Sequence, residues 1–192
     1  MNLIDVLDDN GSPTGKTMSL TDANLKGKWH AGVHIALYTP DRRVVLQQRS
    51  KTIMFYPGLW DLGVGGAVEA GESIYNAAMR EVEEELGVVP HNLTSVTRWK
   101  YNHRVATYKM HVKVLLYAFI AEADPAHFML QRSEVQDVRL LPIGIVHDAL
   151  FRHKGLPQIH LEPYESYYRQ LLLAIEEHFK QLHSAGTIED IT

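Results

Sequence analysis

Three glutamates stand at helical spacing near the middle of the chain. Glu81, Glu84 and Glu85 occupy positions i, i+3 and i+4, so on an α-helix they fall within an arc of about 100° and present three carboxylates on one face. Carboxylates clustered near the C-terminal end of a helix repel one another, and the negative end of the helix dipole repels them as well. A hard divalent cation such as Mg²⁺ would offset the repulsion and can bridge carboxylates to substrate phosphates. The alternative is an ordinary solvated acidic face, and the three acids alone do not decide between the two.

The residues around the acids predict the helix that carries them. Ser73 is a favoured N-cap residue, Gly87 is a typical helix stop, and Pro90 prevents continuation, so we expect a helix over about residues 74–86. The glycine-rich run 63–66 precedes it and indicates a strand and loop whose backbone approaches a neighbour closely. Apolar residues beside the acids let the helix pack, at Ile74, Tyr75, Ala78, Met79, Val82 and Leu86.

Strand and helix patterns alternate along the rest of the chain. Residues 1–28 predict an N-terminal β-hairpin extension, because strand-like segments flank an Asn10-Gly11 turn. Residues 163–183 carry apolar side chains every three or four positions and predict an amphipathic C-terminal helix. Such interleaving predicts the α/β fold class, with a mixed sheet between helices. Further expected elements are an antiparallel pair at 32–38 and 44–48, strands at 94–101, 108–121 and 135–140, and a helix at 143–151.

Composition narrows the class of protein. The chain has 192 residues, 45% hydrophobic and 22% charged, which is typical of one globular domain over residues 1–192. A net charge of -4 gives no general attraction for nucleic acid. No apolar run reaches the roughly 18 residues of a membrane span, and residues 1–10 lack a signal-peptide pattern, so we expect a cytoplasmic protein without membrane segments. The absence of cysteine excludes disulfides and thiol nucleophiles.

The spacing around the acids matches a known motif. Residues 66–88 read G-x5-E-x7-R-E-U-x-E-E-x-G-U, where U is an aliphatic residue; the matching positions are Gly66, Glu72, Arg80, Glu81, Val82, Glu84, Glu85, Gly87 and Val88. Seven fixed letters make a chance match rarer than roughly one in a million for a chain of this length. The sequence therefore resembles the Nudix superfamily, and the flanking segments 47–50 and 57–60 are also typical of it.

The resemblance implies an α/β/α sandwich in which residues 66–88 form a loop-helix-loop. It also implies a metal site for Mg²⁺, or Mn²⁺ as an alternative, whose ligands are the Gly66 carbonyl oxygen and the carboxylates of Glu81, Glu84 and Glu85. The implied reaction is attack by water on a phosphoanhydride bond of a small-molecule diphosphate substrate.

The resemblance further implies supporting roles for residues near the ligands. Arg80 and Glu72 are expected to orient the carboxylates, and Glu134, just before the predicted strand at 135–140, is a candidate for a further ligand or base. Glu84, Glu85, Arg80 and Glu134 are thus the predicted catalytic group. Candidates for substrate contacts are the cations Arg49, Arg98, Lys100, Arg104, Lys109 and Lys113, the histidines His30, His34, His103 and His111, and the aromatic residues Trp60 and Tyr101.

Two other functions fit the same resemblance. The N-terminal segment is similar to the branch that includes isopentenyl diphosphate isomerase, but that enzyme carries Cys-Gly-His where this chain has Gly65, Gly66 and Ala67. The catalytic thiol and the metal-binding imidazole of the isomerase are therefore missing here. The second alternative is a Nudix-fold module that binds a nucleotide without cleaving it, for which an eroded motif would be expected. The oligomeric state is left open, a homodimer being one option.

Overall fold

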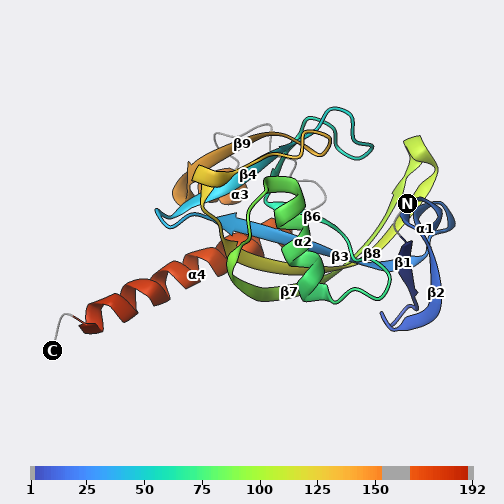
Figure 1. Cartoon of the computed structure of the whole chain (residues 1–192), viewed down its shortest axis with the longest axis horizontal. Coiled ribbons are helices and arrows are strands. Elements are labelled where there is room, and N and C mark those ends of the chain that lie inside the picture. Colours follow the sequence, from blue (N-terminus) through green and yellow to red (C-terminus); the bar gives the residue numbers. More distant parts are fainter. Residues whose placement is uncertain (1–2, 153–164, 190–192) are drawn as a thin grey trace.

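The computed structural model describes residues 3–152 and 165–189 (Figure 1). The first half contains β1 Leu3–Leu7, β2 Pro13–Ser19, α1 Leu20–Lys26, β3 Trp29–Tyr38, β4 Arg43–Arg49, β5 Trp60–Leu62, β6 Val64–Ala67 and α2 Ile74–Leu86. The second half contains β7 His91–Val105, β8 Met110–Glu122, β9 Val135–Pro142, α3 Ile143–Arg152 and α4 Glu165–Glu189, with short 3-10 turns at Ala106–Tyr108 and Pro125–His127. In this part of the chain, no helix is long and apolar enough to cross a membrane.

Strand β3 is the centre of the sheet. It pairs in parallel with β8 and antiparallel with β6, and β8 continues into an antiparallel pair with β7. Strand β4 instead pairs antiparallel with β5 and β9. The expected antiparallel pair of segments 32–38 and 44–48 was therefore wrong over most of its length, since β3 and β4 meet at Tyr38 and Val44 and then separate. The long partners of β3 and β4, which are β8 and β9, lie far away in the sequence.

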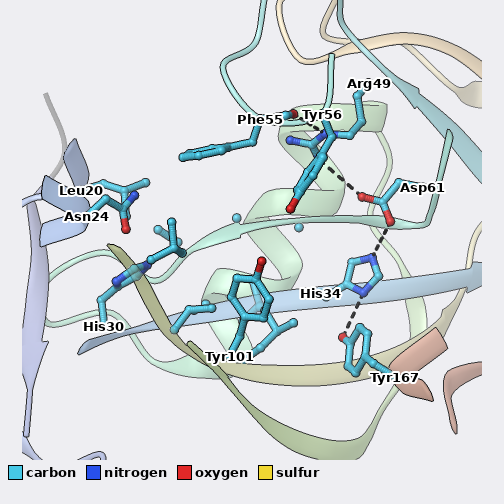
Figure 2. A pocket seen from close by; sticks show the side chains of 18 of the residues that line it. Leu20, Asn24, His30, His34, Arg49, Phe55, Tyr56, Asp61, Tyr101 and Tyr167 are labelled. Atoms are coloured by element: carbon cyan, nitrogen blue, oxygen red, sulfur yellow. Dashed lines mark hydrogen bonds and ion pairs between the residues drawn. The ribbon is translucent and has the colours of Figure 1, made fainter. Parts of the chain in front are cut away.

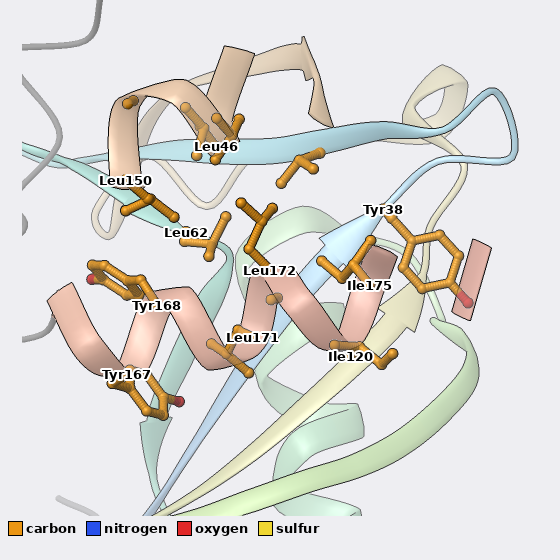
Figure 3. Packing of buried hydrophobic residues seen from close by; sticks show 14 of the residues in the cluster. Tyr38, Leu46, Leu62, Ile120, Leu150, Tyr167, Tyr168, Leu171, Leu172 and Ile175 are labelled. Atoms are coloured by element: carbon orange, nitrogen blue, oxygen red, sulfur yellow. The ribbon is translucent and has the colours of Figure 1, made fainter. Parts of the chain in front are cut away.

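Helices cover both faces of the sheet, as the α/β/α prediction requires. Side chains of β3 alternate between the faces: Val33, Ile35 and Leu37 pack with the apolar residues of α2, whereas Ala36 and Tyr38 pack toward α3 and α4. Figure 3 shows the second of these layers, in which one face of α4 lies against β3, β4, β5 and β8. The predicted fold class is confirmed, a mixed sheet between helical layers.

The N-terminal segment contains a helix that the sequence pattern did not predict. The hairpin of β1 and β2 is antiparallel, and its turn is closed by Asp8, whose carboxylate accepts hydrogen bonds from the Asn10 and Ser12 N–H groups. Helix α1 follows at once, with Ser19 accepting a hydrogen bond from the Asp22 N–H. Seven residues are too few for a recognisable apolar period, which explains why α1 was missed.

The C-terminal helix ends later than predicted. It was expected over residues 163–183, whereas α4 spans Glu165–Glu189, and residues 163 and 164 lie outside the described part of the chain. Tyr167, Leu171 and Ile175 are buried on the inner face of α4, at the predicted three- or four-residue spacing. This places the first turns of α4 over the sheet face opposite α2.

Candidate active site

Helix α2 has the boundaries that its capping residues predict. It spans Ile74–Leu86; the Ser73 side chain accepts a hydrogen bond from the Asn76 N–H, and Gly87 ends the helix at φ 72°. One side chain of the predicted apolar stripe was wrong, because Tyr75 is 55% exposed and contributes little to packing. The acids Glu81 and Glu85 share the buried face instead. The helix therefore turns two carboxylates toward the sheet.

Glu81 and Glu85 lie against the backbone of β6. They are 9% and 4% exposed, and the Gly65 N–H donates a hydrogen bond of 3.1 Å to Oε1 of Glu85. A Cβ atom added to Gly66 would lie 2.3 Å from Oε1 of Glu81. The first glycine of the motif is thus needed because a side chain at Gly66 would occupy the space of the Glu81 carboxylate.

Arg80 connects the carboxylates of the site. Its guanidinium makes a two-pronged pair with Glu72, with Nε–Oε1 and Nη2–Oε2 distances of 2.9 and 3.0 Å. Its Nη1 donates to Oε1 of Glu81 at 2.8 Å and to Oε2 of Glu84 at 3.0 Å, and Nη2 donates to the Ala67 carbonyl at 3.1 Å. Arg80 therefore fixes the loop before α2 and two of the three glutamates at once.

Glu134 joins this group from a distant segment. Its carbonyl accepts a hydrogen bond of 2.7 Å from the Ser50 N–H, which fixes the start of β9 beside the end of β4. The preceding loop docks on the end of α2, where Gln131 N–H donates to the Glu85 carbonyl at 3.0 Å. The Glu134 carboxylate lies near enough to raise the pKa of both Glu81 and Glu85. The structure thus brings together all four acids that the sequence singled out.

The protein does not supply enough positive charge to keep its buried acids readily ionised. Burial raises the pKa of Glu81 to about 7 although Arg80 favours its charged form, and Glu84 and Glu134 raise it further. Burial also raises the pKa of Glu85 well above its usual range, with Glu81 and Glu134 acting in the same direction. A bound cation would reverse this, because it favours ionised carboxylates.

The donor atoms of this cluster suit a hard cation. Among the described residues, no three histidine, aspartate or glutamate side chains already stand in the arrangement of a metal site. In this structure, Nη1 of Arg80 donates hydrogen bonds to oxygens of Glu81 and Glu84. Carboxylate oxygens with unmet negative charge are nonetheless the ligands that Mg²⁺ and Mn²⁺ prefer. Binding would require those oxygens to turn from Nη1 toward the ion.

A cavity of about 290 Å³ lies beside the glycine strand (Figure 2). Gly65 and Gly66 line it and also contact the buried glutamates, so only backbone separates the cavity from the carboxylates at this point. Arg49 lines the same cavity and lowers the pKa of Glu85 by its charge. The position of Arg49 suits an anionic group that lies between Arg49 and the glycine strand. Aromatic rings form much of the remaining wall, at Phe55, Tyr56, Tyr101, Tyr167 and Tyr168.

A buried polar network crosses one end of the cavity, and sequence reasoning missed it. Asp61 pairs with Arg49 at 3.4 Å and lies 3.6 Å from Nε2 of His34, and it accepts a hydrogen bond from the Tyr168 hydroxyl. Nδ1 of His34 and the Tyr167 hydroxyl are 2.9 Å apart. The network ties α4 to β3, β4 and β5. Its only sequence signal was one acid between two core residues of a short strand.

Some of the residues predicted to contact the substrate line the cavity, and the others lie in the core or on the β7–β8 hairpin. His30, His34, Arg49 and Tyr101 line the cavity. Trp60 does not: it is 4% exposed in the core, beneath the guanidinium of Arg139. The remaining candidates lie elsewhere on the β7–β8 hairpin, and Arg104, Lys109 and His111 line a separate groove beside the end of α1.

Helices cover both faces of a mixed sheet, and two buried glutamates of α2 lie against a glycine strand that lines a cavity. The NUDIX domain profile matches residues 28–164, and the chain belongs to this family. An uncharacterised Nudix hydrolase of Listeria monocytogenes, lmo0368, is 31% identical over 138 residues, which cover 71% of this chain and 78% of that protein. The family assignment agrees with the predicted hydrolase activity.

Relatives with another activity are also similar to the chain. An isopentenyl-diphosphate Delta-isomerase of Streptomyces avermitilis is 33% identical over 101 residues, covering 53% of this chain and 51% of that protein. Among solved structures, DR0079 of Deinococcus radiodurans has a TM-score of 0.60 at 18% identity, covering 79% of this chain and 88% of its own. The NUDIX domain of Shewanella oneidensis NrtR, solved in complex with ADP ribose, has a TM-score of 0.53 at 22% identity, covering 79% and 87%. These structures support the fold.

Proposed function

We propose that this Nudix hydrolase cleaves a phosphoanhydride bond of a small-molecule diphosphate by attack of water, with Mg²⁺ or Mn²⁺ as cofactor. One observation carries the proposal. Two buried carboxylates, Glu81 and Glu85, lie against glycines that line a cavity, and burial and neighbouring acids raise their pKa values because the protein supplies no full counter-charge for their ionised forms. A divalent cation bridging these acids to a diphosphate would supply that counter-charge.

The residues of the motif would hold the metal. Glu81, Glu84, Glu85 and the Gly66 carbonyl are the proposed ligands, after Arg80 releases the oxygens that it contacts in this structure. When bound, the metal neutralises phosphate oxygens and lowers the pKa of water. Glu81 and Glu85 would then be fully ionised at neutral pH.

The chain's own groups would do the remaining work. Arg49, whose guanidinium lines the cavity near Glu85, would bind a phosphate oxygen of the substrate. Arg80 would keep the loop and α2 together through its two bonds to Glu72. A glutamate would take the proton from the attacking water, and Glu84, Glu85 and Glu134 are the candidates.

The isomerase alternative conflicts with the backbone at Gly65. A Cβ atom there would lie 2.3 Å from the Val33 carbonyl oxygen, so neither cysteine nor any other side chain fits without a shift of β6 or β3. The chain also contains no cysteine. The similarity to isomerases therefore does not extend to a catalytic thiol.

The binding-module alternative is not favoured by the site. The NrtR domain was solved with ADP ribose, and a nucleotide-binding role would need a cavity but no acidic cluster. Here four acids converge beside the cavity at a cost in charge repulsion. We infer that the cluster is kept for chemistry.

Direct measurement of turnover tests the proposal. Purified protein is incubated with a panel of nucleoside di- and triphosphates, nucleotide sugars, ADP ribose and isoprenoid diphosphates, with Mg²⁺, Mn²⁺ or EDTA. We expect hydrolysis of at least one diphosphate with metal and none in EDTA. The matched control is Glu83→Gln, an exposed acid of the same helix that should retain activity. No turnover of any compound with either metal would contradict the proposal.

A further inference from the structure

Asp61 lies at the end of the cavity where α4 meets the sheet (Figure 2). The two oxygens of its carboxylate have different partners. Oδ1 accepts hydrogen bonds from the Leu62 N–H, at 2.8 Å, and from the Tyr168 hydroxyl near the start of α4. Oδ2 lies 3.4 Å from Nη1 of Arg49. One carboxylate therefore connects α4 with an arginine that lines the cavity.

The side chain of Arg49 is held at two points. Its Nε donates a hydrogen bond of 3.0 Å to the Phe55 carbonyl, and its Nη1 lies against Asp61. A guanidinium carries five N–H donors in one plane, so fixing two of them fixes the direction of the others. Those others have no acceptor within the described residues. They are therefore available to phosphate oxygens of a ligand in the cavity.

Only the contact with Arg49 requires an acid at position 61. Asparagine could accept the bonds from Leu62 and Tyr168 on its one oxygen, but its NH2 group would then face the donors of Arg49. The negative charge also has a cost, because it partly cancels the attraction of Arg49 for an anionic substrate. Since the Arg49 and Asp61 side chains are only 25% and 18% exposed, solvent screens the pair in part. Orientation of Arg49 explains why an acid stands here.

We propose that Asp61 is a positioning residue, which orients Arg49 toward the diphosphate of the substrate and is itself held by Tyr168 of α4. The proposal rests on the proposed function, because Arg49 is taken to bind a phosphate oxygen there. The NUDIX domain profile ends at residue 164, so α4 makes this contact from outside the matched part of the chain. The contact of α4 with Asp61 thus affects how tightly the diphosphate is bound.

Asp61→Asn tests the role, because it keeps the shape and the acceptor for Tyr168 but places a donor against Arg49. Binding of methylenediphosphonate with Mg²⁺ is measured by calorimetry, or by ³¹P NMR where it is weak. This compound resists hydrolysis and contains only the part that all candidate substrates share. We expect Asp61→Asn to weaken its binding roughly tenfold, equivalent to about 1.4 kcal/mol. For a diphosphate that is hydrolysed, KM should rise by a similar factor, whereas kcat should change less than about twofold.

A double-mutant cycle with Arg49→Ala separates positioning from a purely structural role. Without Arg49, Asp61 has no cation to orient, and its negative charge repels the diphosphonate. In the Arg49→Ala background, Asp61→Asn should therefore leave binding unchanged or tighten it. A structural defect at position 61 would instead weaken binding by the same factor in both backgrounds, and this result would overturn the proposal.

Two further variants complete the test. Tyr168→Phe removes the hydroxyl that holds Asp61, and it should weaken the same binding about threefold when Arg49 is present and not at all in the Arg49→Ala background. It also decides the question if Asp61→Asn does not fold. Asp148→Asn is the matched control, because it breaks an Arg–Asp pair of similar length, 3.2 Å to Arg152, outside the cavity. This control should change no affinity.

The outcomes also separate this proposal from the proposed function. Diphosphonate binding that depends on Asp61 only when Arg49 is present, without turnover of any diphosphate, would support positioning and contradict hydrolysis. Turnover in which Asp61→Asn lowers kcat and leaves KM unchanged would support hydrolysis and overturn positioning. Unchanged diphosphonate binding in Asp61→Asn, or no binding by the wild type, would overturn positioning as well.

Discussion

Replacing Glu81 with glutamine should stabilise the metal-free protein at alkaline pH. Burial raises the pKa of Glu81 from 4.5 to about 7, so between these values the folded protein holds a proton that the unfolded chain releases. The stabilisation by the protonated acid is complete below the unfolded pKa and is lost as the pH rises through the folded pKa. This rise in pKa corresponds to a loss of about 3 kcal/mol in the free energy of unfolding, at roughly 1.36 kcal/mol per pKa unit. Glutamine is uncharged at every pH, so the variant does not lose this stability as the pH rises.

Melting curves in EDTA at pH 5 and pH 8 measure the effect. At about 2–4 °C per kcal/mol for a chain of this size, Glu81→Gln should melt roughly 6–12 °C above the wild type at pH 8 and within about 3 °C of it at pH 5. Glu83→Gln, on the exposed face of the same helix, should show no such pH dependence. The reasoning is refuted if Glu81→Gln melts below the wild type at pH 8, because the ion pair with Arg80 would then outweigh the cost of burial.

Further predictions follow from the same site. Gly66→Ala should lose most activity with little change in melting temperature, because its Cβ would displace the Glu81 carboxylate; the control Gly144→Ala, which meets no atom within 4 Å, should remain fully active, and equal activity of both variants would contradict the close packing. Arg80→Lys loses the two-pronged pair with Glu72 and should cost roughly 10–100-fold in kcat/KM or in the Mg²⁺ concentration needed; an unchanged metal titration would show that Arg80 does not orient the ligands. Excess EDTA should abolish turnover while far-ultraviolet circular dichroism stays unchanged. Purified protein with Mg²⁺ should form no dimethylallyl diphosphate from isopentenyl diphosphate, and product above background would restore the isomerase interpretation.

The acidic helix could be predicted from sequence because its signals are local. Capping by Ser73 and Gly87 and the spacing of the acids depend on neighbours within one or two turns, and the observed helix begins and ends where they indicate. Which acids are buried was not predictable in the same way. The burial of Glu81 and Glu85 depends on the glycines of β6, whose pairing with β3 is a long-range feature.

The cavity and its polar groups could not be predicted for the same reason. Asp61, His34 and Tyr167 meet across more than a hundred residues of chain, and no local period marks their contact. Helix α1 was missed because seven residues give too short a pattern, yet it supplies Asn24 to the cavity. Glu134 was found only through the family resemblance, since its own neighbours in sequence read as an ordinary loop.

Hydrolysis in ¹⁸O-labelled water tests the central claim most directly. A diphosphate that the protein turns over is cleaved with Mg²⁺ in this solvent, and the products are analysed by mass spectrometry for the wild type and Glu85→Gln. We predict one ¹⁸O atom per cleavage on a phosphate product, none on the carbon-bound oxygens of the organic group, and a loss of at least roughly a thousandfold in the variant, equivalent to about 4 kcal/mol of transition-state stabilisation. Label on carbon, or a fully active Glu85→Gln, would contradict water attack at phosphorus directed by the glutamates of α2.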